Sequence, residues 1–348
     1  MKLRPGLLRY RKRLESLGFW RSIYYIAKVI YGETFRRRGP NTFGLRMVEI
    51  GVTKECQCNC PHCYAIEDGY TSEINELSKR EIFSIVDQIV DMGAIEICFS
   101  GGEPLIRKDI VDLVEYARKM KMVPKINTNG ILLTENMVRK LKQAGLAWCM
   151  VSIDHSHPSI HDSFRGYENC FTRAINGLKE LVKQGIPSGI TTVARKELIR
   201  SGVLAEIVSL GHELKVNSVR ILFPVLTGRF KNAFDEVLSP EERDSVRKLL
   251  KDPLVSMEYK NKHTICTAGI TKYNILPNGD VTPCVFVPIV FGNTRHDNMK
   301  EIWKRMNGFA HLDKPQGQCP LSDPSYMERA MKSNLENIII GDHEKGDL

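Results

Sequence analysis

Short apolar segments of strand type alternate with helical segments from Arg46 to Phe223, and this alternation limits the fold more than any other feature. Repeated strand–helix–strand units predict a parallel sheet, with the functional loops at the carboxyl ends of its strands. Six units are too few to close an eight-unit barrel. We therefore predict an α/β fold built on a TIM-like partial (β/α)6 barrel. The expected strands are 47–53, 94–99, 123–128, 147–154, 188–193 and 218–223, and the expected helices are 78–92, 109–120, 134–144, 171–184 and 203–213.

The alternation stops near residue 235, and a smaller α+β domain is expected from 236 to 325. A helix is predicted after Ser239, a β-hairpin from 273 to 287 with its turn at Asn278-Gly279, and a helix over 298–308. The expected organisation is an N-terminal extension over 1–45, the barrel over 46–235, the small domain over 236–325 and a polar tail over 326–348.

The positive charge of the chain lies in its N-terminal extension. Residues 1–40 contain eleven Lys or Arg and two acids, a net charge of +9. This equals the net charge of the whole chain of 348 residues. Aromatic residues share this segment at helical spacing, and no apolar run in it is long enough to span a bilayer. Two readings remain open: a helix packed on the barrel, or a helix lying on an anionic membrane surface. Nucleic-acid binding is not expected, because no recognised module is present.

Four cysteines occur within eight residues directly after the first predicted strand. Read as C-x3-C-x2-C, three of them are Cys56, Cys60 and Cys63. Three thiolates can hold three irons of a four-iron, four-sulfur cluster and leave the fourth iron open to a small molecule. Short cysteine spacings also suit tetrahedral zinc, which is the alternative at this point.

A glycine-rich turn follows the second predicted strand as Ser100-Gly101-Gly102-Glu103-Pro104. Two glycines let the backbone approach a ligand closely and present its polar groups. Taken alone, such a segment could be no more than a tight turn. Its position one βα unit after the cysteines favours a ligand-binding role.

With both motifs in this order, the chain resembles the radical S-adenosylmethionine (SAM) superfamily over about residues 46–230. Cys56, Cys60 and Cys63 match the cluster motif, and Ser100 to Pro104 match the motif that binds the methionine part of SAM. The resemblance implies a [4Fe-4S] cluster, SAM, and an external one-electron reductant of flavodoxin or ferredoxin type. It also implies reductive cleavage of SAM to a 5′-deoxyadenosyl radical, which abstracts a substrate hydrogen.

The same resemblance implies further SAM contacts. Ser152 and Arg165 look like the family's contacts to the ribose and carboxylate, and a guanidinium fork suits a carboxylate. A surface ion pair of Arg165 with Asp162 or Glu168 is the alternative. Further cofactor-lining candidates are Asn129, Thr192 and Leu222.

Strand alternation turns two acids toward the barrel interior. If Ser100 and Ser152 face inward, so do Glu96 and Asp154. These carboxylates are candidates for substrate binding or proton transfer. A structural ion pair with Lys125 or a helix cap is the alternative.

Three later cysteines, Cys266, Cys284 and Cys319, resemble the opening of the SPASM and twitch extensions, which hold auxiliary iron–sulfur clusters. This chain lacks the further tight cysteine cluster of a full SPASM domain, so one auxiliary cluster, of the [4Fe-4S] type, is expected. Its fourth ligand is left open between substrate, a non-cysteine side chain and Cys170. Packing of three cysteines without a metal is the alternative.

The expected function is radical chemistry in which the auxiliary cluster assists an oxidation, cyclisation or cross-link. A lipid or membrane-presented substrate or a peptide is favoured, with tetrapyrroles and sugars as alternatives. A non-catalytic iron–sulfur or zinc protein is the alternative of a different class. Clustered rather than scattered cysteines indicate a reducing compartment, and we therefore expect a cytoplasmic protein. A peripheral position on the membrane surface is expected only if residues 1–40 bind it.

Overall fold

The computed structural model describes residues 45–65, 75–322 with gaps at 260, 262, 265 and 311–315, and residues 325–326. The predictions for residues 1–40 therefore lie outside the described residues. Within that described part, no helix is both long and apolar enough to cross a membrane.

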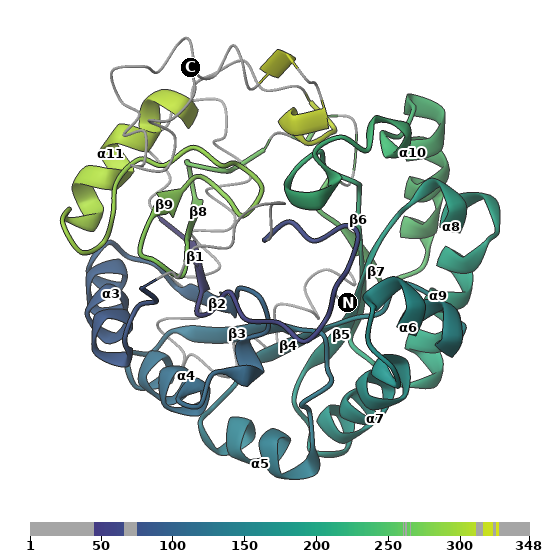
Figure 1. Cartoon of the computed structure of the whole chain (residues 1–348), viewed down its shortest axis with the longest axis horizontal. Coiled ribbons are helices and arrows are strands. Elements are labelled where there is room, and N and C mark those ends of the chain that lie inside the picture. Colours follow the sequence, from purple (N-terminus) through teal and green to yellow (C-terminus); the bar gives the residue numbers. More distant parts are fainter. Residues whose placement is uncertain are drawn as a thin grey trace, which may run out of the picture.

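A nine-stranded sheet forms the centre of the molecule, with helices around its outer face (Figure 1). Its strand order is β7-β6-β5-β4-β3-β2-β1-β8-β9, and every neighbouring pair is parallel except β8 with β9. This is the predicted α/β fold, an open and partial barrel. The strands are β1 (Met47–Gly51), β2 (Glu96–Ser100), β3 (Val123–Thr128), β4 (Trp148–Ser152), β5 (Ser188–Val193), β6 (Ser218–Leu222), β7 (Val255–Met257), β8 (Lys272–Ile275) and β9 (Val281–Thr282).

The predicted helices all form, and several of their ends match the sequence signals. Ser78 and Glu81 make the reciprocal bonds of a capping box at the start of α3, and Thr134 accepts from Met137 N–H at the start of α5. The helices are α3 (Lys79–Asp91), α4 (Ile110–Lys119), α5 (Glu135–Gln143), α6 (Pro158–Arg165), α7 (Cys170–Lys183), α8 (Lys196–Arg200), α9 (Val203–Glu213), α10 (Pro240–Arg247) and α11 (Met299–Ala310).

The sheet has an apolar outer face and a polar inner face. Val48, Ile50, Ile97, Phe99 and Ile126 are fully buried under the helices. Residues one position away along the same strands point to the other face, because side chains alternate along a strand. Burial of the outer face at roughly 25 cal/mol per Å² supplies the main stabilisation, and the inner face is free to carry polar side chains.

The C-terminal residues extend the barrel sheet. β8 pairs in parallel with β1, so that Val48 lies beside Tyr273 and Ile50 beside Ile275. The predicted hairpin is present, since β8 pairs antiparallel with β9 and Gly279 occupies the turn at φ +93°. Its second strand is shorter than expected and ends at Thr282, with Cys284 following in irregular backbone.

Candidate functional site

The cysteine loop follows β1 at the carboxyl end of the sheet, and two other loops hold it. Asn59 N–H donates to Arg165 O at 2.8 Å, at the end of α6. Arg229, from the short helix η3 (Gly228–Phe230) after β6, donates its N–H to Cys63 O at 3.0 Å and its guanidinium to Cys60 O at 3.1 Å. Arg229, which also donates to Asn59 Oδ1, was not predicted from the sequence, because all of its partners in the cysteine loop lie far away along the chain.

The two glycines after β2 pack against the cysteine loop. Gly102 N–H donates to Thr53 O at 2.8 Å, and Glu103 N–H donates to Glu55 O at 2.7 Å. A Cβ at Gly102 would lie 2.2 Å from Glu55 O, and one at Gly101 would lie 2.3 Å from Thr53 O. The glycines therefore allow backbone to approach backbone, whereas the sequence reasoning assigned that approach to a ligand.

Glu103 is buried, and its carboxylate is used inside the protein. It accepts from Leu105 N–H at 3.0 Å, Thr128 Oγ1 at 2.7 Å and Asn129 N–H at 2.7 Å. Burial raises the pKa of Glu103 to about 7, although these three donors act in the opposite direction. The side chain joins the glycine turn to the end of β3 and so fixes the position of Asn129.

Asn129 lies where β3 ends, with its side chain directed at the cysteine loop. Its Nδ2 donates to Gln57 Oε1 at 3.2 Å and lies 3.6 Å from Cys58 Sγ and 3.9 Å from Cys56 Sγ. Its Oδ1 accepts from Ile131 N–H at 2.9 Å. Asn129 is thus brought to the predicted site, as expected.

Arg165 is buried between Asp154 and Cys60. Its Nη2 lies 2.5 Å from Asp154 Oδ2, and its Nη1 lies 3.6 Å from Cys60 Sγ. The surface pair with Asp162 or Glu168 is wrong, because α6 turns the guanidinium inward. Burial would raise the pKa of Asp154, but Arg165, with smaller contributions from His62, His161 and Arg195, lowers it to about 2. Asp154 is therefore a charged partner of Arg165 and does not serve as a proton donor near neutral pH.

The two serines proposed to contact SAM lie where the alternation places them. Ser100 is buried at the end of β2, and Ser152 ends β4 in register with Thr191. Leu222 ends β6 and lines a pocket described below. Thr192 is a correction: it is paired with Ile221 on the helix-covered face, with its Oγ1 buried and without a partner among the described residues. Its neighbour Thr191 faces the interior, since adjacent residues point to opposite faces.

Glu96 forms the structural ion pair with Lys125 that was the alternative to a role in substrate binding or proton transfer. It is 3% exposed and forms an ion pair with Lys125 on the neighbouring strand. The ion pair with Lys125 accounts for the burial of this carboxylate on the inner face.

Two further cysteines lie at the cysteine loop. Cys58 and Cys170 are buried in one cluster with Cys60 and Ile131, and their thiols share a hydrogen bond. Cys170 begins α7 and packs beside Cys58, so it is not available as the fourth ligand of the later cysteine set. His161 also lies nearby, on α6, a helix that was not predicted from the sequence. Its Nδ1 accepts from Asp154 N–H at 3.1 Å.

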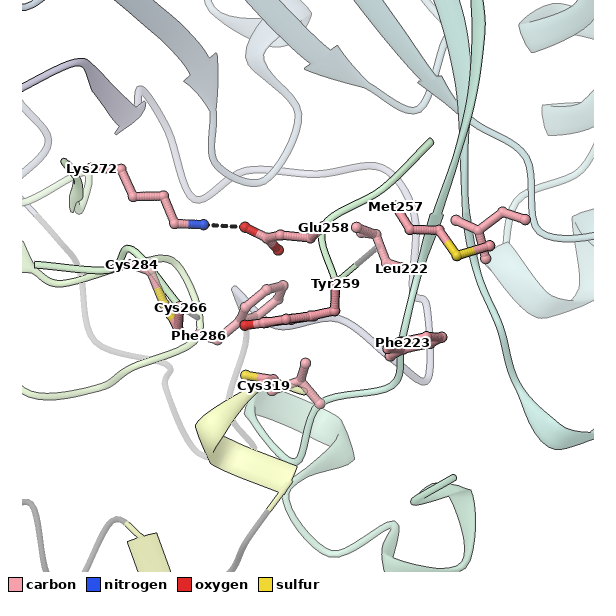
Figure 2. A pocket seen from close by; sticks show the side chains of 12 residues that line it. Leu222, Phe223, Met257, Glu258, Tyr259, Cys266, Lys272, Cys284, Phe286 and Cys319 are labelled. Atoms are coloured by element: carbon pink, nitrogen blue, oxygen red, sulfur yellow. Dashed lines mark hydrogen bonds and ion pairs between the residues drawn. The ribbon is translucent and has the colours of Figure 1, made fainter. Parts of the chain in front are cut away.

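The later cysteines meet at a pocket where β6 and β7 end. Cys266, Cys284 and Cys319 line it together with Tyr259 and the Lys272–Glu258 ion pair (Figure 2). Burial raises the pKa of Cys284 to about 11, Lys272 acts in the opposite direction, and the charge of Cys266 raises it further. The three sulfurs thus line one pocket and influence one another's ionisation. Tyr259 and Glu258 were missed, because β7 is only three residues long.

Both cysteine sets fit iron–sulfur centres by their chemistry. In the first, the hydrogen bond from Cys58 and the charge of Arg165 outweigh burial and lower the pKa of Cys60 to about 7. Thiolates are the form that binds metal. In the second, the buried thiols of Cys266 and Cys319 and the partly buried thiol of Cys284 line one pocket with the cationic Lys272. No group of three His, Cys, Asp or Glu among the described residues is arranged for a single metal ion.

Family models match both regions of the chain. The model described as the radical SAM superfamily matches residues 50–199, and an iron–sulfur cluster-binding domain matches residues 266–321. The chain is 27% identical over 315 residues to an AdoMet-dependent heme synthase of Methanosarcina barkeri, covering 80% of this chain and 88% of that protein. It is 26% identical over 278 residues to the PqqA peptide cyclase of Rhizobium meliloti, covering 74% and 73%.

The fold agrees with these matches. The structure of Streptococcus suis SuiB bound to the precursor peptide SuiA superposes with a TM-score of 0.63 at 18% identity, covering 82% of this chain and 68% of that one. The implied cofactors are a [4Fe-4S] cluster, SAM and an auxiliary iron–sulfur cluster. The chain is a radical SAM enzyme with a C-terminal iron–sulfur cluster-binding domain.

Proposed function

We propose that the chain oxidises an organic substrate by radical chemistry at the carboxyl end of the barrel, with a second iron–sulfur centre as electron acceptor. The observation that carries this is the pocket where β6 and β7 end, which gathers Cys266, Cys284 and Cys319. It lies at the same end of the sheet as the loop that holds Cys56, Cys60 and Cys63.

Each side chain has a proposed part. Cys56, Cys60 and Cys63 would hold the first cluster, and Cys266, Cys284 and Cys319 the auxiliary one. When bound, the reduced first cluster supplies the electron that cleaves SAM to methionine and a 5′-deoxyadenosyl radical. Arg165, neutralised in part by Asp154, would place its charge beside Cys60 and the carboxylate of SAM. Asn129, Ser100, Ser152 and Leu222 would line the cofactor, and Glu103 would act indirectly by fixing Asn129.

Among substrates, a tetrapyrrole is the first candidate. Similarity to the heme synthase extends over 80% of this chain and 88% of that protein. A peptide is the second candidate, because a peptide cyclase is matched over 74% of the chain. The expected lipid substrate depended on residues 1–40 and has no support from these relatives.

Anaerobic reconstitution followed by chemical analysis tests the proposal. We expect about eight irons per chain, as two four-iron clusters require, and formation of 5′-deoxyadenosine that needs both SAM and dithionite. The triple variant C56A/C60A/C63A should lose about half of the iron and all 5′-deoxyadenosine. Bound zinc, or iron whose spectrum ignores SAM, would contradict the proposal.

Product analysis tests the substrate class. The reduced holoenzyme is incubated with SAM and either a tetrapyrrole carboxylic acid or a peptide, and the products are examined by mass spectrometry. A mass change that needs SAM, and that the cysteine triple variant does not produce, identifies the class. No change in any tetrapyrrole would remove the first candidate.

A further inference from the structure

The inner face of the barrel carries an arginine that has neutral hydrogen-bond partners. Arg220 is the central residue of β6 and is half-buried. Its Nε donates to Thr191 Oγ1 at 3.2 Å, and its Nη2 donates to Asn127 Oδ1 at 3.3 Å. Because Asn127 belongs to β3, three strands away in the sheet order, the guanidinium reaches across the barrel interior.

The charged groups around Arg220 are paired with one another. Lys125 pairs with Glu96, and Lys272 pairs with Glu258. Asn127, which accepts from Arg220, also donates its Nδ2 to Glu49 Oε1 at 3.4 Å. Among the described residues, no ion pair of Arg220 with an acid within 4.0 Å is found. A guanidinium in a partly desolvated interior is costly unless an anion compensates it.

A second arginine adds to the positive charge of this region. Lys272, Arg220 and Arg46 all act on Glu258 and lower its pKa, against the effect of burial. The Nε of Arg46 is buried without a hydrogen-bond partner among the described residues. Of these cations, Lys272 pairs directly with Glu258, which lines the pocket that contains the auxiliary cysteines.

The guanidinium of Arg220 is oriented but not neutralised. Thr191 and Asn127 accept from two of its five N–H donors. The planar guanidinium is therefore oriented by neutral groups alone. A carboxylate matches such a fork with two parallel hydrogen bonds. Arg220 lies in one register with Thr191 on β5 and Ser152 on β4, so a group bound there would lie on the same inner face as the proposed SAM contacts.

We propose that Arg220 binds a carboxylate of the substrate inside the barrel. The inference rests on the proposed function, since it assigns a substrate contact of that same site. The carboxylate could belong to a tetrapyrrole side chain or to a peptide, and the arms of the experiment distinguish these two sources.

Equilibrium binding to the anaerobically reconstituted holoenzyme tests the proposal without turnover. One arm compares coproporphyrin III with its tetramethyl ester, and the other compares a short peptide with its C-terminally amidated, side-chain-esterified form. Intrinsic tryptophan fluorescence reports binding. For one of the two pairs, we expect the free acid to bind roughly tenfold or more tightly than its neutral derivative, as a charge-assisted bidentate contact requires.

Variants connect this preference to Arg220. In R220Q the preference for the free acid should disappear, and in R220K it should be intermediate, because an ammonium keeps the charge but loses the fork. R139Q removes an exposed arginine on α5, which donates to Asn136 Oδ1 at 2.8 Å, and should keep the wild-type preference. Iron content and thermal unfolding of each variant exclude misfolding as the cause.

Three results would overturn the proposal. They are a wild-type enzyme that prefers neither free acid, a folded R220Q variant that keeps the preference, and an R220Q variant whose only defect is weaker SAM binding. Failure of the proposed function is a separate result, since it appears as missing iron or missing 5′-deoxyadenosine in the wild type.

Discussion

The buried pair of Asp154 and Arg165 allows a quantitative test of the first cysteine site. The side chains of Asp154 and Arg165 are 2% and 9% exposed, and the two groups lie 2.5 Å apart. Removing one partner of a buried ion pair leaves the other charge uncompensated, which typically costs about 3–5 kcal/mol. We expect D154N to reduce the free energy of unfolding by about 3 kcal/mol, because Asn keeps the shape and removes the charge.

The dependence on pH follows from the pKa of Asp154. Its value of about 2 in the folded protein lies below its ordinary value of 3.8. A lowered pKa contributes stability that is present above pH 4 and is lost as the pH falls through 2. The contribution at neutral pH is about 2 kcal/mol by that linkage. The destabilisation by D154N should therefore be the same at pH 7 and pH 5.

Urea unfolding of the reconstituted protein under anaerobic conditions measures these differences. R165Q should also be destabilising, and the double variant D154N/R165Q should lose much less than the sum of the two single variants. D112N, which removes an exposed pair with Lys79, serves as a control and should have little effect. Additive single effects, or a D154N variant as stable as the wild type, would refute the reasoning.

Four further predictions follow from the site. G102A should be destabilised by about 3 kcal/mol or more in urea unfolding, because its Cβ would lie 2.2 Å from Glu55 O. E103Q places an amide N–H against backbone donors, and we expect two effects. The free energy of unfolding should fall by about 1–3 kcal/mol, measured by urea unfolding. SAM binding should weaken, measured by calorimetry. C58A should keep the full iron content, and loss of iron would make it a ligand. C319A should lose about four irons while dithionite-dependent 5′-deoxyadenosine formation continues.

Much of the barrel was predictable because its signals are local. Apolar strands, capped helices and the short cysteine spacing all lie within a few residues of one another, so periodicity and capping chemistry locate them. Ser78 with Glu81 shows this, since both parts of the capping box are visible in the sequence.

The rest depends on contacts between distant residues. Nothing in the sequence connects Arg229 to Cys60, or Arg220 to Asn127, because neither pair shares a motif. Thr192 was assigned to the wrong face because a one-residue choice within a strand decides which side chain points inward. The β7 strand is too short for its alternation to be detected, and Tyr259 was missed with it.

The pairing of β8 with β1 has a consequence for how the protein is made. Met47 pairs with Lys272 in this ladder. More than two hundred further residues must therefore be synthesised after β1 before its second edge is covered. During that time the nascent barrel exposes an unpaired parallel edge, which invites misassociation. A gene fragment ending after β6 would retain the first cysteine loop but leave this edge of β1 uncovered, and we therefore expect its product to aggregate.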